Sequence, residues 1–226
     1  MGDVRWATFD CFGTLVDWRH GIATTAELLF PGRGPELLEL YNKHERKVQA
    51  ETPAMRYGGV LEEALRRATR EAGLELREDD ASALSATIPY WPVFPDVPRA
   101  LADLRAAGWR LALLTNCDNV FIGESQRRLG VHIDAVVTAE HVGSYKPNPS
   151  HFTRFEESFG AMRDNWVHVA EGYFHDIEPA HALAIPRVWI NRQGLTDDPS
   201  IADVVLPDLA DVLNAVEQTH AAAQRR

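Results

Sequence analysis

The segment Arg5–Trp18 (RWATFDCFGTLVDW) constrains the fold of this chain more than any other part. Its apolar run WATF predicts a buried strand, which ends at Asp10, and Gly13 then turns the chain. An acidic side chain at the carboxyl end of a buried parallel strand lies where open α/β sheets bind ligands. A carboxylate there can attack an electrophilic carbon or phosphorus and form a covalent ester. The alternative is that Asp10 only caps the turn, as Asp often does.

Length and charge restrict the classes of protein. The chain has 226 residues, which suits one domain with a sizeable insertion. Its formal net charge of −10 argues against nucleic acid as a partner. No apolar run is long enough for a signal peptide or a membrane span, so no membrane partner is expected. Cys11 and Cys117 are too few for a disulfide framework, and we expect a cytoplasmic protein.

After the first strand the pattern becomes helical and contains no strand until about Tyr90. The expected helices are Ile22–Phe30, a helix that opens at Pro35 and ends before Thr52, a helix through Val60 and Ala68 that closes at Gly73, and Glu78–Ala86. Four successive helices predict an inserted α-helical cap over residues 18–91. Residues 1–17 and 92–226 would then form the catalytic core.

Strands and helices alternate from Val93 onward, which is typical of a parallel α/β sheet. The expected elements are helix Pro98–Ala107, strand Trp109–Leu114, a helix through Leu129, strand Ala135–Thr138, a loop over Glu140–Pro149, helix Ser150–Gly160, strand Trp166–Ala170, helix Asp176–Leu183, strand Arg187–Ile190, edge strand Asp203–Leu206 and helix Leu209–Gln218. We expect a Rossmann-like parallel sheet with the first strand at its centre, between Trp109–Leu114 and Trp166–Ala170. The carboxyl ends of these three strands would then meet at one edge.

Four stretches resemble the motifs of the haloacid dehalogenase (HAD) superfamily in the order of that family: FDCFGTLVDW, LLTN, SYKPNPSHF and VAEGYFHDIEPA. The resemblance covers nearly the whole chain and implies the HAD fold. Within the superfamily the chain looks most like the type II 2-haloacid dehalogenases. Phosphatases of the superfamily carry a second Asp two residues after the nucleophile, as general acid, where this chain has Phe12.

The resemblance implies an aspartyl-ester hydrolase that acts on a small 2-substituted carboxylic acid, with a 2-haloacid as the default substrate. Asp10 would be the nucleophile, and Lys146 would pair with it and keep its pKa low. The residues implied as catalytic are Asp10, Lys146, Asp176, Thr14 and Asn116, and those implied as substrate-binding are Cys11, Phe12, Thr115, Asn42 and Tyr173. No metal or other cofactor is implied, and cap helices of relatives suggest a homodimer.

Three departures from the type II pattern keep alternatives open. Asn42 stands where these enzymes carry the Arg that receives the halide. Arg46, one helical turn on, or Arg56 would have to substitute for it, and neither matches the motif. Displacement of another leaving group, such as a ring nitrogen, would suit Asn42. Phe12 replaces a Tyr, and Glu171, Gly172 and Tyr173 replace a Ser and Asn pattern.

Glu171 also opens a metal-dependent alternative. Asp10, Glu171 and Asp176 together would offer oxygen ligands to Mg²⁺, as in a phosphatase. A binding protein without catalysis is a third class, disfavoured by the complete set of motifs. Thiol catalysis by Cys11 or Cys117 is disfavoured because small thiols pack well in cores.

Overall fold

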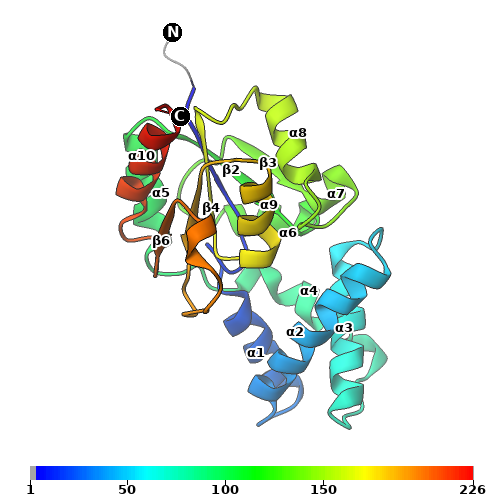
Figure 1. The fold of residues 1–226 in the computed structure, drawn as a ribbon. Helices are drawn as coiled ribbons and strands as arrows, with labels where there is room; N and C mark the ends of the chain where they lie inside the picture. The colour runs from blue at the N-terminus through cyan, green and yellow to red at the C-terminus, as the bar shows by residue number, and fades with distance from the viewer. Residues whose placement is uncertain (1–3, 226) are drawn as a thin grey trace.

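The computed structural model describes residues 4–225, which form one parallel sheet covered by helices and a separate group of helices beside it (Figure 1). The strands of the sheet are β1 (Trp6–Phe9), β2 (Arg110–Thr115), β3 (Ala135–Thr138), β4 (Trp166–Ala170), β5 (Arg187–Ile190) and β6 (Val204–Leu206). Their order in space is β3-β2-β1-β4-β5-β6. The predicted Rossmann-like α/β sheet is therefore confirmed, with β6 at the predicted edge.

Strand β1 lies inside the sheet, hydrogen-bonded to β2 on one edge and to β4 on the other. All four of its residues are buried, which is the continuous apolar pattern of a parallel strand between two helical layers. Phe9 pairs with Leu113 on β2 and with Val169 on β4. The prediction that β2 and β4 flank the first strand is correct, so their carboxyl ends lie together at one edge of the sheet.

The helices of the sheet layers are α5 (Val97–Ala106), α6 (Asn119–Gln126), α7 (Ala139–Val142), α8 (Ser150–Phe159), α9 (Glu178–Ala182) and α10 (Val212–Ala223). One apolar cluster joins residues of α5, α6 and α10 to the sheet, and a second joins α8 and α9 to its other face. Two sequence predictions need correction here. The expected loop from residue 140 begins with the short helix α7, which Thr138 caps by accepting the N–H of His141. The helix expected from Asp176 is preceded by a π-helical turn, Tyr173–Ile177.

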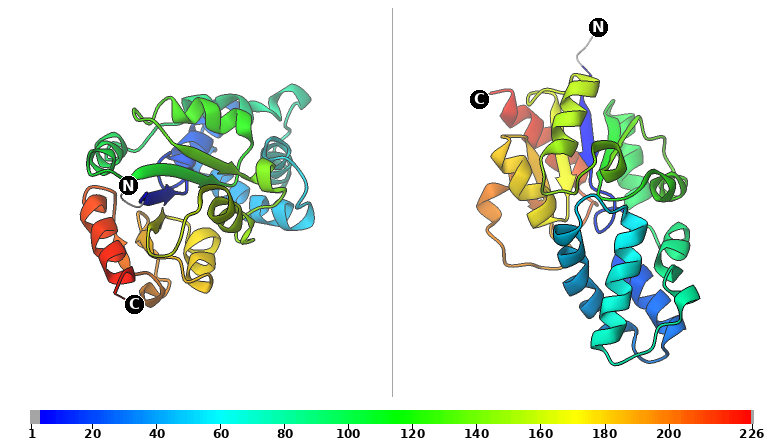
Figure 2. Two further views of the ribbon diagram at one scale, coloured as in Figure 1. Left: turned by 90° about the horizontal axis from the view of Figure 1, so that it is seen from above. Right: turned by 90° about the vertical axis from the view of Figure 1, so that its right-hand side faces the viewer.

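The remaining helices lie together below the sheet, in blue to green in Figure 1 and in the right-hand view of Figure 2. They are α1 (Trp18–Leu29), α2 (Gly34–Glu51), α3 (Tyr57–Glu71) and α4 (Ala83–Thr87), with short 3₁₀ turns at Glu78–Asp80 and Ile88–Tyr90. Helix α1 begins before the predicted residue, because the Asp17 carboxylate caps it by accepting the N–H of His20. The single helix predicted over residues 78–86 is wrong, since it is broken into these shorter pieces.

Apolar and polar contacts join the four helices to the sheet. The ring of Phe12, just after β1, meets Trp91 edge to face with centroids 5.8 Å apart. Both carboxylate oxygens of Asp118 accept N–H groups at the start of α3, from Tyr57 and Gly58, at 3.1 Å each. Within residues 4–225, no helix is long and apolar enough to cross a membrane.

Candidate active site

Asp10 follows the last residue of β1 and lies at the edge where the central strands end. Its backbone N–H still donates to Val169 on β4, so the strand pairing fixes where its side chain begins. Gly13 has a φ of +106°, a conformation that favours glycine, and lets the chain turn sharply beneath the carboxylate. The turn brings Thr14 back, and its hydroxyl donates to Asp10 Oδ2 at 3.1 Å.

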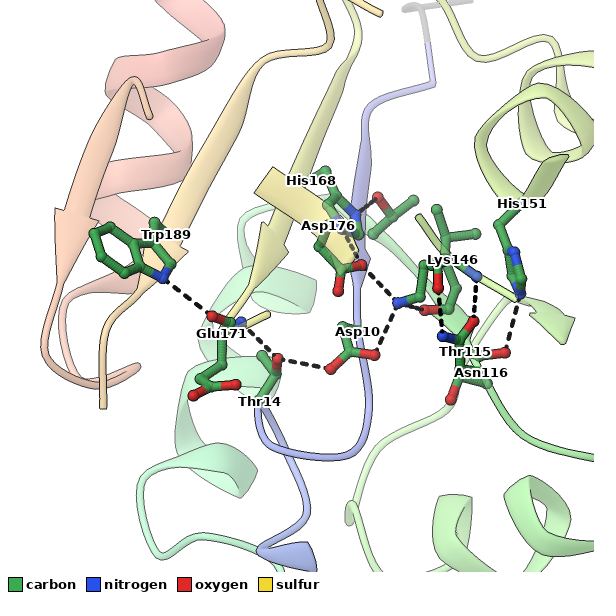
Figure 3. A network of polar contacts seen from close by, with 12 residues as sticks. Asp10, Thr14, Thr115, Asn116, Lys146, His151, His168, Glu171, Asp176 and Trp189 are labelled. Atoms are coloured by element: carbon green, nitrogen blue, oxygen red, sulfur yellow. Dashed lines mark hydrogen bonds and ion pairs between the residues drawn. The ribbon is translucent and has the colours of Figure 1, made fainter. Parts of the chain in front are cut away.

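Lys146 joins Asp10 to Asp176 at the centre of the site (Figure 3). Its Nζ donates to Asp10 Oδ1 at 2.9 Å, to Asp176 Oδ1 at 2.6 Å and to the backbone oxygen of Leu114 at 2.8 Å. The three donors of the ammonium therefore all have acceptors. Lys146 is 1% exposed, so these contacts are made away from bulk water and the geometry is fixed by the surrounding fold.

The protonation of this trio differs from the sequence expectation. Burial raises the pKa of Asp10, and the negative charge of Asp176 adds to this, so the opposing effect of Lys146 does not keep it low. Burial also opposes the charge of Asp176, but Lys146 and His168 outweigh it and lower the pKa of Asp176 to about 2. Burial lowers the pKa of Lys146, yet the two carboxylates raise it overall. One ammonium thus serves two carboxylates and favours the nearer one, Asp176.

A chain of buried hydrogen bonds supports Asp176 from behind. Trp166 Nε1 donates to Thr8 Oγ1 at 2.7 Å, and Thr8 Oγ1 lies 2.9 Å from His168 Nδ1. His168 Nε2 lies 3.1 Å from Asp176 Oδ1. Because an indole only donates, the consistent assignment has Thr8 donating to Nδ1 and the imidazole donating from Nε2 to the carboxylate. The contact between His168 and Asp176 could not be inferred from the sequence, because no motif residue of the sequence analysis points to His168.

Asn116, at the end of β2, shapes the loop that carries Lys146. Its side-chain amide donates to the Lys146 backbone oxygen at 3.1 Å and accepts the Lys146 backbone N–H at 2.7 Å. Thr115 hydrogen-bonds through its backbone oxygen to His151, 3.1 Å away. Asn116 therefore positions the lysine as well as facing the cavity.

A cavity of about 360 Å³ opens onto these groups, between the edge of the sheet and helix α2. The predicted residues that line it are Asp10, Phe12, Asn42, Thr115, Asn116, Lys146, Glu171, Tyr173 and Asp176. Thr14 touches Asp10 without lining the cavity. The Cys11 side chain is fully buried in the apolar cluster and does not line the cavity, so only its backbone remains for the expected substrate contact.

Residues of α1 and α2 line the side of the cavity that faces Asp10, and they limit the choice of a halide-receiving cation. Arg56 is the wrong candidate, because its side chain is 73% exposed and pairs with Glu140 at 3.0 Å. Arg46 and Arg19 line the cavity, as do Glu45 and Gln49, and of these four only Arg46 was a candidate from the sequence. The signal for the last two was their spacing on α2 beside Asn42. A polar stripe of this kind usually indicates a solvated helix face.

The alternative Mg²⁺ set does not form a metal-binding group. Among residues 4–225, no cluster of three or more His, Cys, Asp or Glu side chains is arranged to hold a metal ion. Lys146 occupies Asp10 Oδ1 and Asp176 Oδ1, and Glu171 Oε1 accepts from Gln193 at 2.8 Å. The Glu171 carboxylate points away from Asp10 and Asp176 in Figure 3. The donor set therefore does not fit the metal.

A family model described as haloacid dehalogenase-like hydrolase matches residues 4–184. This chain belongs to that family. It is 29% identical over 204 residues to haloacetate dehalogenase H-2 of Moraxella sp. (strain B), and the alignment covers 88% of this chain and 90% of the relative. The family match makes the chain a hydrolase of the haloacid dehalogenase type.

Solved structures agree with the family in fold. The L-2-haloacid dehalogenase RSc1362 superposes with a TM-score of 0.84 at 24% identity, covering 95% of this chain and 99% of its own. The L-2-haloacid dehalogenase from Xanthobacter autotrophicus with chloropropionic acid covalently bound gives a TM-score of 0.81 at 21% identity, with coverage of 95% and 99%. These likenesses extend over both the sheet and the helices beside it.

Proposed function

We propose that this hydrolase cleaves the bond between the 2-carbon and its substituent in a small carboxylic acid, with a 2-haloacid as the first candidate. One observation carries the proposal: Asp10 opens onto a cavity while Lys146 and Thr14 hold its two oxygens. The names of the relatives, which are haloacetate and 2-haloacid dehalogenases, support the substrate class. Helices α1 to α4 would act as the cap of this site, with the predicted limits at residues 18 and 91.

The reaction would begin with attack of an Asp10 oxygen on the 2-carbon. A carbon–oxygen bond forms, the carbon–halogen bond breaks, and the halide leaves with the bonding electrons. The oxygen of Asp10 that does not attack stays hydrogen-bonded, either to Lys146 or to Thr14. These same donors would stabilise the negative charge that develops when water attacks the ester carbonyl.

Phe12 separates this chemistry from phosphate-ester hydrolysis. A phenyl ring two residues after Asp10 can move no proton to a leaving alcohol, whereas a halide needs none. Asn116, Thr115 and Lys146 line the part of the cavity beside Asp10 and would orient the substrate carboxylate.

Water that attacks the ester must lose a proton to a base. Asp176, with a pKa of about 2, is a weak base, and its contacts favour a role in holding Lys146. Burial raises the pKa of Glu171 to about 7, and the carboxylate of Asp10 adds to this. A base with a pKa near the working pH is the most effective, and Glu171 lines the same cavity as Asp10, so we assign proton acceptance to Glu171. Its carboxylate would have to turn from Gln193 toward Asp10 to reach the attacking water.

The experiment uses ¹⁸O-water with 2-chloropropanoate, a panel of phosphate esters, and EDTA or Mg²⁺. We expect chloride release that EDTA does not change, and heavy oxygen entering the Asp10 peptide over multiple turnovers. Glu171→Gln should slow ester hydrolysis and let an Asp10 adduct accumulate in the intact-mass spectrum. Label in the product alone would show direct attack by water, and phosphate release that EDTA abolishes would show the metal-dependent phosphatase; either result overturns the proposal.

A further inference from the structure

The cavity has two walls of different origin. The core wall carries Asp10 and Lys146, and the cap wall is formed chiefly by helix α2. In a displacement at carbon, the leaving group departs on the side opposite the nucleophile. The halide therefore departs on the side away from Asp10, and a longer substituent of the 2-carbon, which extends sideways from that line, can reach the residues of α2 that line the cavity.

Four polar residues of α2 line the cavity: Asn42, Glu45, Arg46 and Gln49. Their spacing of i, i+3, i+4 and i+7 places them on one face of the helix. The adjoining face of the helix packs into the apolar cluster through Leu37, Tyr41 and Val48, and the face opposite the four residues, which carries Lys43 and Lys47, is exposed. We call these four cavity-lining residues the α2 stripe. Packing of the adjoining face holds the stripe toward the cavity.

The stripe and the cavity are larger than a short haloacid requires. Seven residues of helix advance by about 10 Å. A three-carbon haloacid is roughly 4–5 Å long, from bond lengths near 1.5 Å. Even if each of its non-hydrogen atoms took the volume of a water molecule in the liquid, about 30 Å³, it would fill about half of a cavity of 360 Å³.

The side chains of the α2 stripe indicate what kind of substrate group would fill the rest of the cavity. Gln49 Nε2 donates to Glu45 Oε1 at 3.0 Å, so the two side chains are held together. Burial raises the pKa of Glu45 to about 7, although Arg46 and Tyr57 oppose this. An ionised Glu45 would repel an anionic group of the substrate, and Arg46 would repel a cationic one. A neutral group that both donates and accepts hydrogen bonds suits carboxyl, amide and guanidinium partners together.

We propose that the α2 stripe is a second subsite, which binds a hydroxyl or amide group carried by the substrate beyond its reacting carbon. The inference rests on the proposed function and narrows its substrate class to 2-substituted acids with a polar, uncharged side chain. An alkyl side chain of the same size would displace water from the stripe without replacing the hydrogen bonds of that water, which disfavours its binding.

The test compares two substrates of equal size that extend beyond three carbons, 2-chloro-4-hydroxybutanoate and 2-chloropentanoate. Their kcat/KM ratio is measured in the wild type, in Glu45→Leu and in Lys47→Leu, an exposed residue of α2 outside the stripe. Dividing the ratio of each variant by that of the wild type removes the difference in intrinsic reactivity. We expect Glu45→Leu to lower the preference for the hydroxyl about tenfold and Lys47→Leu to leave it unchanged.

The outcomes separate this proposal from the function on which it rests. Chloride release from both substrates with a ratio that Glu45→Leu does not change overturns the subsite and leaves the function standing. No chloride release from either substrate, or from 2-chloropropanoate, overturns the function itself. Circular dichroism checks the fold of the variant, and Gln49→Leu provides the same comparison if Glu45→Leu does not fold.

Discussion

At the scale of single residues, the site is governed by one positive charge shared between two buried carboxylates. When Asp10, Lys146 and Asp176 are all ionised, the trio carries a net charge of −1 in a region that excludes water. Burial and the charge of Asp176 raise the pKa of Asp10 above that of an exposed carboxyl. The ionised nucleophile is therefore a less stable state of the folded protein than of the unfolded chain.

This imbalance predicts that Asp10→Asn stabilises the protein while abolishing turnover. A folded-state pKa above the unfolded value means that the folded state loses stability as pH rises through the Asp10 pKa. The amide removes that charge and leaves Lys146 to Asp176. We expect a rise in Tm of about 2–4 °C at pH 7, corresponding to roughly 1 kcal/mol for a chain of this size.

Thermal unfolding of the wild type and Asp10→Asn between pH 4 and pH 8 measures this effect. The Tm difference should shrink as pH falls, because Asp10 of the wild type becomes protonated. Thr115→Val serves as a control that changes a cavity residue without changing charge. A lower Tm for Asp10→Asn at every pH would contradict the account of Asp10.

The position of His168 predicts an effect on activity without contact to the substrate. In His168→Phe, Asp176 loses a hydrogen-bond donor and attracts the Lys146 ammonium more strongly. Less of the positive charge of Lys146 then acts on Asp10. We expect kcat to fall roughly tenfold, as for other lost outer hydrogen-bond partners, and the acidic limb of kcat/KM to move to higher pH. Thr8→Ser keeps the hydroxyl and should stay near the wild type, whereas Thr8→Val should show part of the change. An unshifted pH profile in His168→Phe would remove the positioning role.

At the scale of helices and strands, α1 packs closely against Trp91 at the end of the cap because Gly21 has no side chain. A Cβ on Gly21 in α1 would lie 2.3 Å from Cγ of Trp91, which is itself 2% exposed. Trp91 also contacts Phe12, two residues after the nucleophile. Gly21 therefore lets the cap approach the turn that carries the site.

Gly21→Ala is expected to destabilise the protein by about 1–3 kcal/mol through this overlap, despite the better helix propensity of Ala. Gly123→Ala in α6 is the matched control, because nothing lies within 4 Å of its added Cβ. That change should be neutral or stabilising by up to about 1 kcal/mol. Urea denaturation of both variants measures the free energies, and equal stability of the two would refute the close packing of Gly21.

Some features of the fold and of the site could be predicted from the sequence, and others could not. The order of the three central strands, β2-β1-β4, was predicted from apolar runs and right-handed connections, and the convergence of Asp10, Thr115 and Asp176 was predicted from that order. Helix α7 was missed because its few residues give no periodicity. The α2 stripe was missed because a polar helix face has the same pattern whether it meets water or a cavity. The pKa of Asp10 was misjudged because a pairwise motif does not show that Asp176 competes for Lys146.

At the scale of the whole molecule, the cap is tied to the core at a few points beside the site. Asp118 follows β2 and caps α3, and the Tyr145 hydroxyl, one residue before Lys146, donates to the Met55 backbone oxygen at 2.6 Å. The loops that carry Asn116 and Lys146 thus also hold the cap. The predicted homodimer stays a prediction, which light scattering of the purified protein would test.

Asp118→Ala is expected to loosen α3 and raise KM several-fold with a smaller change in kcat. The variant leaves two N–H groups at the helix start without their acceptor, at a cost of about 1 kcal/mol. Hydrogen exchange of the Tyr57 and Gly58 amides should accelerate. In Asp118→Asn, which retains one acceptor oxygen, the exchange rates should lie between those of the wild type and those of Asp118→Ala. Unchanged exchange at these amides would show that the cap does not depend on Asp118.

The central place of β1 has a consequence for how the chain is made in the cell. Phe9 leaves the ribosome about 160 residues before its neighbour Val169. At 5–20 residues per second, roughly ten to thirty seconds separate the two. Throughout that interval an apolar strand has no partner on one side, so a nascent chain of this protein depends on a holding chaperone or on temporary cover by the helices that follow it. Truncated or stalled products would contain the nucleophile and yet aggregate before they could react.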